Sequence, residues 1–120
     1  MNIKALTKAS IDIGDMERAA SQASTLLRAL GNGTRLMILC HLSQGEKSVG
    51  ALQALLGVEQ SPLSQHLARL RKDGLVATRR EAQTIHYSIA SDEAARVIAT
   101  LYEIYCGPAQ AGKTQHPKAR

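Results

Sequence analysis

The 120 residues are predicted to form one mainly α-helical domain with a single β-hairpin. Three observations predict this fold class. Apolar residues recur at helical spacing along most of the chain. Glycine-containing breaks separate these helical stretches. Two short stretches with alternating apolar residues lie on either side of the dipeptide "AQ", which is typical of two strands joined by a tight turn. A chain of this length can form one modest core but not two.

Three helices are predicted in the first half of the chain. The first runs from about Asp15, a suitable N-cap, to Leu30, and it carries one apolar stripe. The "GNG" stretch that follows ends this helix, because glycine accepts left-handed backbone angles. Thr34 is then expected to cap a second helix, "RLMILCHL". After a loop, "SQGE", Ser48 caps a short third helix, "VGALQALL", which a glycine terminates.

The second half begins with the clearest helix of the chain, "SPLSQHLARLRKDG". Ser61 is expected to be its N-cap, with Pro62 at the first helical position and Gly74 just beyond the end. The strands "LVATRRE" and "TIHYSI" follow. The last helix starts at Ser91 and ends at "CGP", with two carboxylates favourably placed in its first turn.

The domain boundaries follow from these elements. Residues 1–14 are expected to be a flexible N-terminal segment, 15–107 the folded domain and 108–120 a basic disordered tail. The N-terminal residues include lysines and an aspartate, which is not typical of a signal peptide. The longest apolar run, "LMILC", is far shorter than the ~18 residues that span a bilayer. We therefore expect a cytoplasmic protein with no membrane partner.

The distribution of charge predicts that the domain binds DNA. The formal net charge is +5, and basic residues concentrate between residues 69 and 80 and in the tail. The third and fourth helices, separated by the short turn "GVEQ", form a helix-turn-helix, and the basic hairpin behind them forms a wing. A recognition helix needs short polar side chains at its start and cations further along. The predicted DNA contacts are Gln60, Ser61, Ser64, Gln65, His66, Arg69, Arg71, Lys72, Arg79, Arg80, Gln83 and Thr84.

From about Ala20 to Cys106 the chain resembles the ArsR/SmtB family of dimeric winged-helix repressors. The stretches that carry the resemblance are "LLRALGNGTRLMILCHL", "SPLSQHLARLRKDGLVATRREAQTIHYSI" and the closing helix. The resemblance implies a homodimer in which the first and last helices pair across a two-fold axis. The apolar stripes of these two helices are wider than one small monomer needs, which independently fits. Two recognition helices about 34 Å apart would then read an inverted-repeat operator in double-stranded DNA.

Many members of that family sense metals, but their metal-ligand patterns are not matched here. Where one family site has Cys-x-Cys in the third helix, this chain has Ser48 and Gly50. At the start of the last helix Asp92 is present, but Ala94 stands at the position of the family histidine. A zinc site needs three or four clustered ligands, and the four histidines are scattered. We expect no metal site and no other cofactor.

The two cysteines, Cys40 and Cys106, have two interpretations. From the residues alone, they are two small buried apolar side chains, a common use of free cysteine. One branch of the resembled family, which includes sulfide-responsive repressors and haemolysin regulators, senses reactive sulfur or oxidants through cysteines at matching places. The resemblance implies a redox-sensing pair whose cross-linking releases DNA. The sequence leaves open whether persulfide, peroxide or another oxidant is the inducer, and whether the bridge is a disulfide or a polysulfide.

Three alternative functions remain. The first is a redox-insensitive winged-helix regulator or anti-repressor with structural cysteines, and the second is a metal-responsive repressor. The third is a small enzyme, which is not expected, because the chain has no glycine-rich phosphate loop and no carboxylate pair in a pocket-like context. The neighbouring Ser61, Ser64 and His66 belong to the start of the recognition helix.

Overall fold

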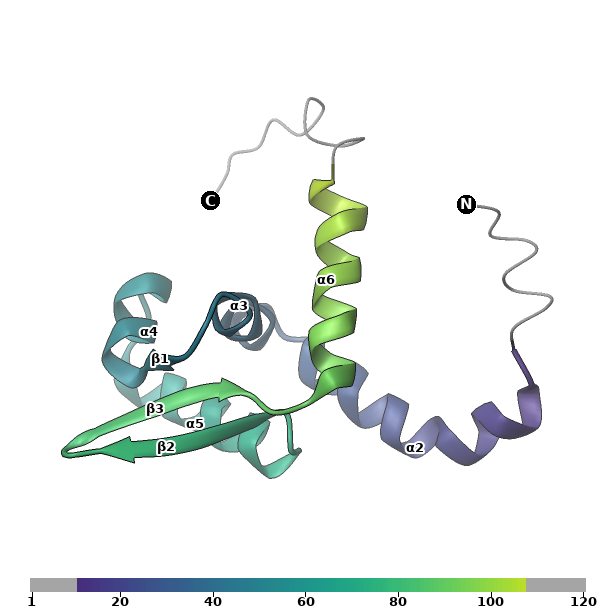
Figure 1. Ribbon diagram of the computed structural model, residues 1–120, viewed down its shortest axis with the longest axis horizontal. Helices are drawn as coiled ribbons and strands as arrows, with labels where there is room; N and C mark the ends of the chain where they lie inside the picture. The colour runs from purple at the N-terminus through teal and green to yellow at the C-terminus, as the bar shows by residue number, and fades with distance from the viewer. Residues whose placement is uncertain (1–10, 108–120) are drawn as a thin grey trace.

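The computed structural model describes residues 11–107, which form five helices and a three-stranded sheet (Figure 1). Of the predicted flexible segments 1–14 and 108–120, residues 1–10 and 108–120 lie outside the described residues, whereas Ile13 and Gly14 already belong to the first helix. The predicted order of four helices, a hairpin and a last helix is confirmed. The elements are α2 (Ile13–Leu30), α3 (Gly33–Leu42), β1 (Lys47–Ser48), α4 (Val49–Leu56), α5 (Gln60–Lys72), β2 (Val76–Glu81), β3 (Thr84–Ile89) and α6 (Asp92–Cys106).

The sheet has the strand order β1-β3-β2 and is antiparallel throughout. The predicted hairpin and its two-residue turn are confirmed, with Glu81 opposite Thr84. The strand β1 was not predicted. It consists of two residues that pair with Tyr87 and His86 of β3, so it is too short to show the alternation by which strands are recognised in a sequence.

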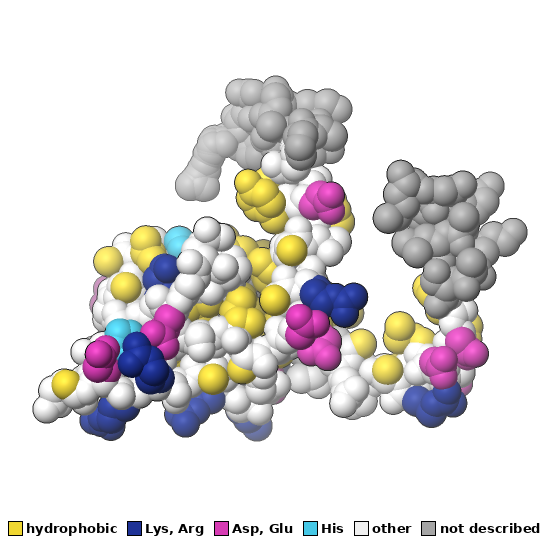
Figure 2. Space-filling model, viewed as in Figure 1, with side chains coloured by type: hydrophobic (Ala, Val, Ile, Leu, Met, Phe, Trp, Pro, Cys, Tyr) yellow, Lys and Arg dark blue, Asp and Glu magenta, His cyan; other side chains and the backbone are white. Residues whose placement is uncertain are grey.

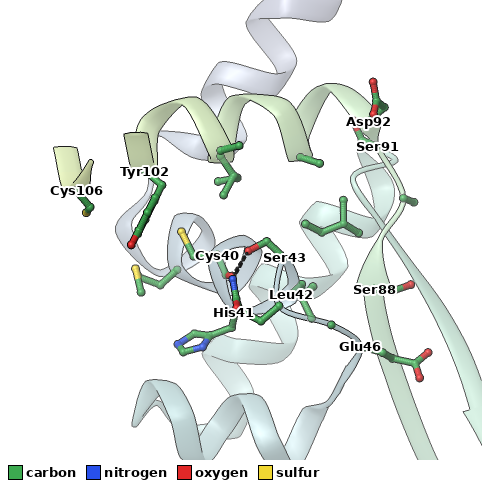
Figure 3. A pocket seen from close by; sticks show the side chains of 18 residues that line it. Cys40, His41, Leu42, Ser43, Glu46, Ser88, Ser91, Asp92, Tyr102 and Cys106 are labelled. Atoms are coloured by element: carbon green, nitrogen blue, oxygen red, sulfur yellow. Dashed lines mark hydrogen bonds between the residues drawn. The ribbon is translucent and has the colours of Figure 1, made fainter. Parts of the chain in front are cut away.

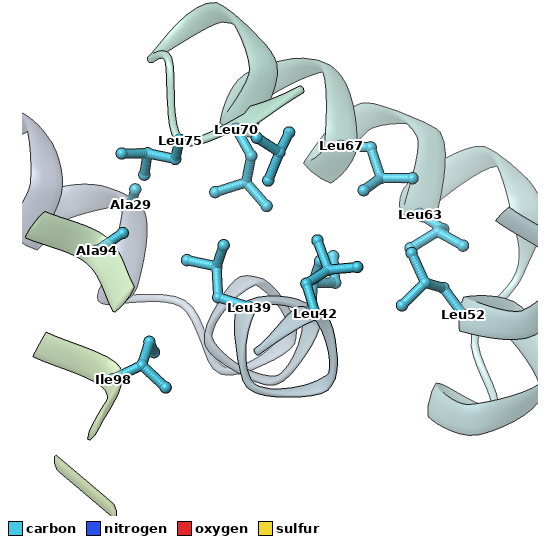
Figure 4. Close-up of a cluster of buried hydrophobic side chains, with 12 residues drawn as sticks. Ala29, Leu39, Leu42, Leu52, Leu63, Leu67, Leu70, Leu75, Ala94 and Ile98 are labelled. Atoms are coloured by element: carbon cyan, nitrogen blue, oxygen red, sulfur yellow. The ribbon is translucent and has the colours of Figure 1, made fainter. Parts of the chain in front are cut away.

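The core is aliphatic and is built around α3. Leu39 and Leu42 of α3 face the row of leucines on α5, while Ala29 and Ala94 close the side toward α2 and α6 (Figure 4). Each fully buried leucine contributes about 1.5–3 kcal/mol relative to an exposed one. The predicted recognition helix, α5, is therefore held on its inner face by Leu63, Leu67 and Leu70, all of which are buried as predicted. Its opposite face is free for another role.

Three predicted helix starts are wrong by two or three residues. The N-cap of α2 is Asp12, whose side chain accepts a hydrogen bond from the backbone of Asp15. The N-cap of α3 is Asn32 rather than Thr34. In both cases the side chain of an Asp or Asn accepts a hydrogen bond from the backbone N–H three residues further along, as an N-cap does.

The helix α5 begins at Gln60, and its N-cap, Glu59, makes no side-chain capping bond. Pro62 is the third helical residue and not the first. This position suits proline, because the first four N–H groups of a helix have no intrahelical partner and the missing proton leaves none unpaired. The predicted N-caps Ser48 and Ser91 are confirmed by bonds from the N–H groups of Ala51 and Ala94.

The helices α2 and α6 project from the part of the molecule that contains the core (Figure 1). Both expose large apolar side chains, which are Ile13, Met16 and Leu27 on α2 and Tyr102, Ile104 and Tyr105 on α6. Within residues 11–107, none of the helices has the length and apolarity needed to cross a membrane.

Candidate DNA-binding surface and dithiol groove

The exposed face of α5 presents a row of short polar side chains. Gln60, Ser61, Ser64 and Gln65 are all exposed and border one shallow depression at the start of the helix. They are exposed because the buried leucines three and four residues away fix the rotation of the helix. Hydroxyl and amide groups at such a position can donate to and accept from base edges in a major groove.

Basic residues continue this face along α5 and onto the hairpin. Arg71, Lys72 and Arg80 are exposed and have no carboxylate partner among residues 11–107. Arg69 is paired with Asp73, the C-cap residue just beyond the helix, at 3.2 Å. Figure 2 shows dark-blue side chains gathered along the edge formed by α5 and the hairpin. The exposed cations Arg71 and Lys72 thus continue the helix that carries the polar row, and Arg80 lies on the hairpin that follows it.

His66 differs from its neighbours on α5. It is half-buried, and its Nδ1 lies 3.4 Å from Nη1 of Arg35 on α3. The guanidinium of Arg35 also donates to the carbonyl oxygens of Ala29 and Arg28, at 2.9 and 3.1 Å. Burial, and secondly the charge of Arg35, lowers the pKa of His66. Arg35 therefore joins the end of α2 to the recognition helix, a role that the sequence did not reveal.

The hairpin carries the remaining predicted contacts. Gln83 and Thr84 are exposed at its tip, where Ala82 has a positive φ of 56°. Arg79 instead forms two hydrogen bonds with the carboxylate of Glu46, at 2.7 and 3.0 Å. The hydrogen bond from Arg79 is the main reason that the pKa of Glu46 lies below its usual value. Glu46, which the sequence predicts only as part of a loop, is thus a partner of the wing.

Cys40 and Cys106 are free thiols that border the same groove, although they come from different helices (Figure 3). Cys40 lies near the end of α3 and is half-buried against the core, while Cys106 is the last residue of α6 and is exposed. The groove has a volume of about 1310 Å³. Burial, and secondly the negative charge of Cys106, raises the pKa of the Cys40 thiol.

The walls of this groove combine α3, the loop after it, the end of β3 and α6. The ring of Tyr102 points from α6 into the groove, and His41 also borders it (Figure 3). The hydroxyl of Ser43 donates to the carbonyl oxygen of Cys40 at 2.6 Å and so fixes the end of α3. Among residues 11–107, no three His, Cys, Asp or Glu side chains come together as metal ligands.

Known proteins resemble this chain over most of its length. The family model for bacterial regulatory proteins of the arsR family matches residues 32–78. A biofilm growth-associated repressor of Agrobacterium fabrum is 48% identical over 103 residues, which are 82% of this chain and 88% of that protein. The transcriptional activator HlyU of Vibrio cholerae is 48% identical over 101 residues, or 84% of this chain and 94% of HlyU.

Solved structures agree with these sequence matches. Reduced HlyU from Vibrio cholerae has a TM-score of 0.74 and 50% identity, covering 77% of this chain and 97% of that one. A homodimeric winged helix-turn-helix domain from Mycobacterium bovis has a TM-score of 0.70 and 32% identity, covering 90% of this chain and 99% of that one. The winged helix-turn-helix predicted from the sequence is thereby confirmed.

Proposed function

Because the chain belongs to the ArsR family of bacterial regulatory proteins, we propose that it is a DNA-binding transcriptional repressor controlled by its two thiols. In the reduced state the protein binds its operator, and a cross-link between Cys40 and Cys106 makes the protein release the DNA. The observation that carries the proposal is that these two thiols border one groove although they lie on different helices. We expect the protein to act in the cytoplasm, because its proposed partner is double-stranded DNA.

The DNA-binding surface consists of the exposed face of α5 and the wing. The polar side chains at the start of α5 enter the major groove, and the cations beyond them bind phosphates. The proposed contacts are Gln60, Ser61, Ser64, Gln65, Arg69, Arg71, Lys72, Arg80, Gln83 and Thr84. His66 and Arg79 belong to the same surface, but each already has a partner on a different element of the fold, whereas the partner of Arg69 lies only four residues along the chain.

We place the dimer interface on α2 and α6. Both helices project from the core and expose large apolar side chains, which a second copy would cover. The structural relative from Mycobacterium bovis is described as homodimeric. A two-fold dimer would present two copies of α5 to an inverted repeat with half-sites about one helical turn apart.

The difference in exposure between the two thiols gives the order of reaction. With a persulfide RSSH as inducer, the exposed Cys106 thiolate attacks the outer sulfur and displaces RS⁻, which leaves a persulfide on Cys106. The Cys40 thiolate then attacks Sγ of Cys106 and displaces HS⁻, which closes a disulfide. The dithiol loses two electrons, and RSSH is reduced to RSH and H₂S. A second RSSH that extends the Cys106 persulfide before closure would give a longer polysulfide bridge.

Release of DNA follows from the positions of the two helices. The helix α3 carries Cys40 and packs on the recognition helix through Leu39 and Leu42, whereas α6 carries Cys106 and the proposed dimer face. A covalent link between α3 and α6 therefore fixes the recognition helix relative to the two-fold axis. The distance between the two copies of α5 in the dimer then no longer matches the spacing of the two operator half-sites.

One observation favours the alternative of a redox-insensitive regulator or anti-repressor. Cys40 packs against the core cluster, as a purely structural cysteine would. This alternative predicts that thiol oxidants leave DNA binding unchanged.

The test is DNA release measured by fluorescence anisotropy, with a duplex recovered from a random-sequence pool by the reduced protein. The reduced protein should bind this duplex, and glutathione persulfide should release it. Cys40→Ser and Cys106→Ser should each bind as well as the unaltered protein and stay bound after treatment. Ser43→Ala, next to Cys40 in the fold, is the matched control and should still be released.

Mass spectrometry of the same samples, after persulfide, peroxide or disulfide treatment, identifies the bridge from the mass change between the two cysteines. If both serine variants leave the DNA as readily as the unaltered protein, thiol sensing is wrong. If the reduced protein selects no sequence from the pool, the DNA-binding function itself is wrong.

A further inference from the structure

We propose that Arg79 does not contact DNA directly but positions the wing, by binding Glu46 in the loop that borders the dithiol groove. This inference rests on the proposed DNA-binding function and assigns a different role to one residue of its surface. By sequence alone, Arg79 and Arg80 are equivalent wing cations. The contacts of the two side chains separate them.

The guanidinium of Arg79 is half exposed but is already paired with a carboxylate. Its Nε and Nη2 donate to the two carboxylate oxygens of Glu46 at 3.0 and 2.7 Å, a bidentate arrangement. Its Nη1 lies 3.7 Å from Glu81, which in turn lies 3.2 Å from Nε2 of His86. A phosphate could bind Arg79 only by displacing Glu46 or by sharing the Arg79 guanidinium with it.

The ion pair spans the whole sheet. Arg79 lies on β2 opposite His86 of the central strand β3, and His86 is paired on its other side with Ser48 of β1. Glu46 comes just before β1, so the Arg79 side chain reaches from one edge strand to the start of the other. With only two residues, β1 supplies few backbone bonds of its own. The Glu46 ion pair therefore adds a tether between the wing and the loop of residues 43–46.

Arg80 offers the opposite arrangement. Successive side chains of a strand point to opposite faces, so Arg79 and Arg80 cannot both face the same partner. Arg80 is exposed near the tip, donates to the carbonyl oxygen of Ala82 at 3.2 Å, and has no carboxylate partner among residues 11–107. It is the wing cation that remains free for phosphate.

The loop that carries Glu46 also borders the groove that contains Cys40 and Cys106. The same loop is fixed to the end of α3 by Ser43. Through Glu46, the wing is therefore attached to the part of the fold that the proposed cross-link would strain.

The test compares the salt dependence of DNA binding for Arg79→Gln, Arg80→Gln and Glu46→Gln, with the duplex selected by the reduced protein. Each lost phosphate contact lowers the slope of log K against log salt by about 0.9, or about 1.8 for a dimer with two wings. Arg80→Gln should show this loss. Arg79→Gln and Glu46→Gln should both weaken binding by up to about fivefold with an unchanged slope.

A direct contact predicts the opposite sign for Glu46→Gln. If Glu46 merely competes with phosphate for Arg79, removing its charge should strengthen binding, and Arg79→Gln should lower the slope as Arg80→Gln does. Either result overturns the proposal. The charge exchange Glu46→Arg with Arg79→Glu should restore binding lost in Arg79→Glu alone, which a phosphate contact at Arg79 would not allow.

Circular dichroism at matched concentration checks that each variant is folded. Failure of the proposed function is a separate outcome. In that case the unaltered protein selects no duplex from the pool, and the positioning role of Arg79 fails with it.

Discussion

The two cysteines are chemically different because the fold exposes one and half-buries the other. Cys106 ends α6 and is open to solvent, whereas Cys40 packs against the core cluster and its pKa is raised by that burial. The raised pKa lowers the fraction of Cys40 that is thiolate at neutral pH, since desolvation penalises the charged form. Such a thiol suits the second step of a cross-link better than the first.

We predict that Cys40 in a Cys106→Ser variant reacts with iodoacetamide at a rate that reaches half its maximum above the pKa of an ordinary thiol, about 8.5. The reaction is followed by mass spectrometry, with free glutathione as the reference. The folded state binds the Cys40 proton more tightly than the unfolded state. The free energy of unfolding should therefore fall as pH rises through this range, and it should fall less in Cys40→Ser. A midpoint at or below that of the reference would contradict the prediction.

At the scale of single elements, α5 shows how far a sequence pattern reaches. Its inner leucines and outer polar row lie as predicted, because the helical period alone decides which residues share a face. His66 is the exception. It belongs to the outer row by spacing, but Arg35 of α3 reaches it across 31 positions of the chain.

We predict that Gln65→Ala, rather than a change at His66, reports sequence recognition by α5. Gln65 is exposed, and its amide makes no hydrogen bond with the described residues 11–107, so its loss should remove base contacts without disturbing packing. Discrimination between the selected duplex and a scrambled one should fall by about 1–3 kcal/mol, with an unchanged salt slope. Both quantities come from anisotropy titrations at several salt concentrations.

The control on the same helix is Lys72→Gln, at an exposed cation. It should lower the affinity for both duplexes equally and reduce the salt slope. If Gln65→Ala behaves like Lys72→Gln, the assignment of the polar row to base readout is wrong.

For the whole molecule, the proposed dimer depends on the projecting helices α2 and α6. A monomer would leave Tyr105 and Leu27 more than 60% exposed, together with further apolar residues on the same two helices. A dimer through these helices would join two copies of α5 at a fixed distance.

We predict that Tyr105→Glu dissociates the dimer, because it places a charge in the apolar interface without lining the dithiol groove. Sedimentation velocity over a range of concentrations should show a monomer where the unaltered protein is a dimer. Affinity for the selected duplex should fall by about 100-fold or more, since a monomer cannot bind both half-sites at once. Glu103→Gln, an exposed polar change two residues away, should leave both properties unchanged. A dimeric Tyr105→Glu would place the interface elsewhere.

By itself, the sequence determined the helices, the hairpin, the inner face of α5 and the basic edge, because these depend on periods and caps within a few neighbouring residues. Only the tertiary structure decided that Glu46 binds Arg79 from 33 positions away, that Arg35 reaches His66, and that β1 joins the sheet. It also decided that Cys40 and Cys106 border one groove. These pairings depend on how separate elements pack, and no local pattern encodes the distance between side chains on different elements.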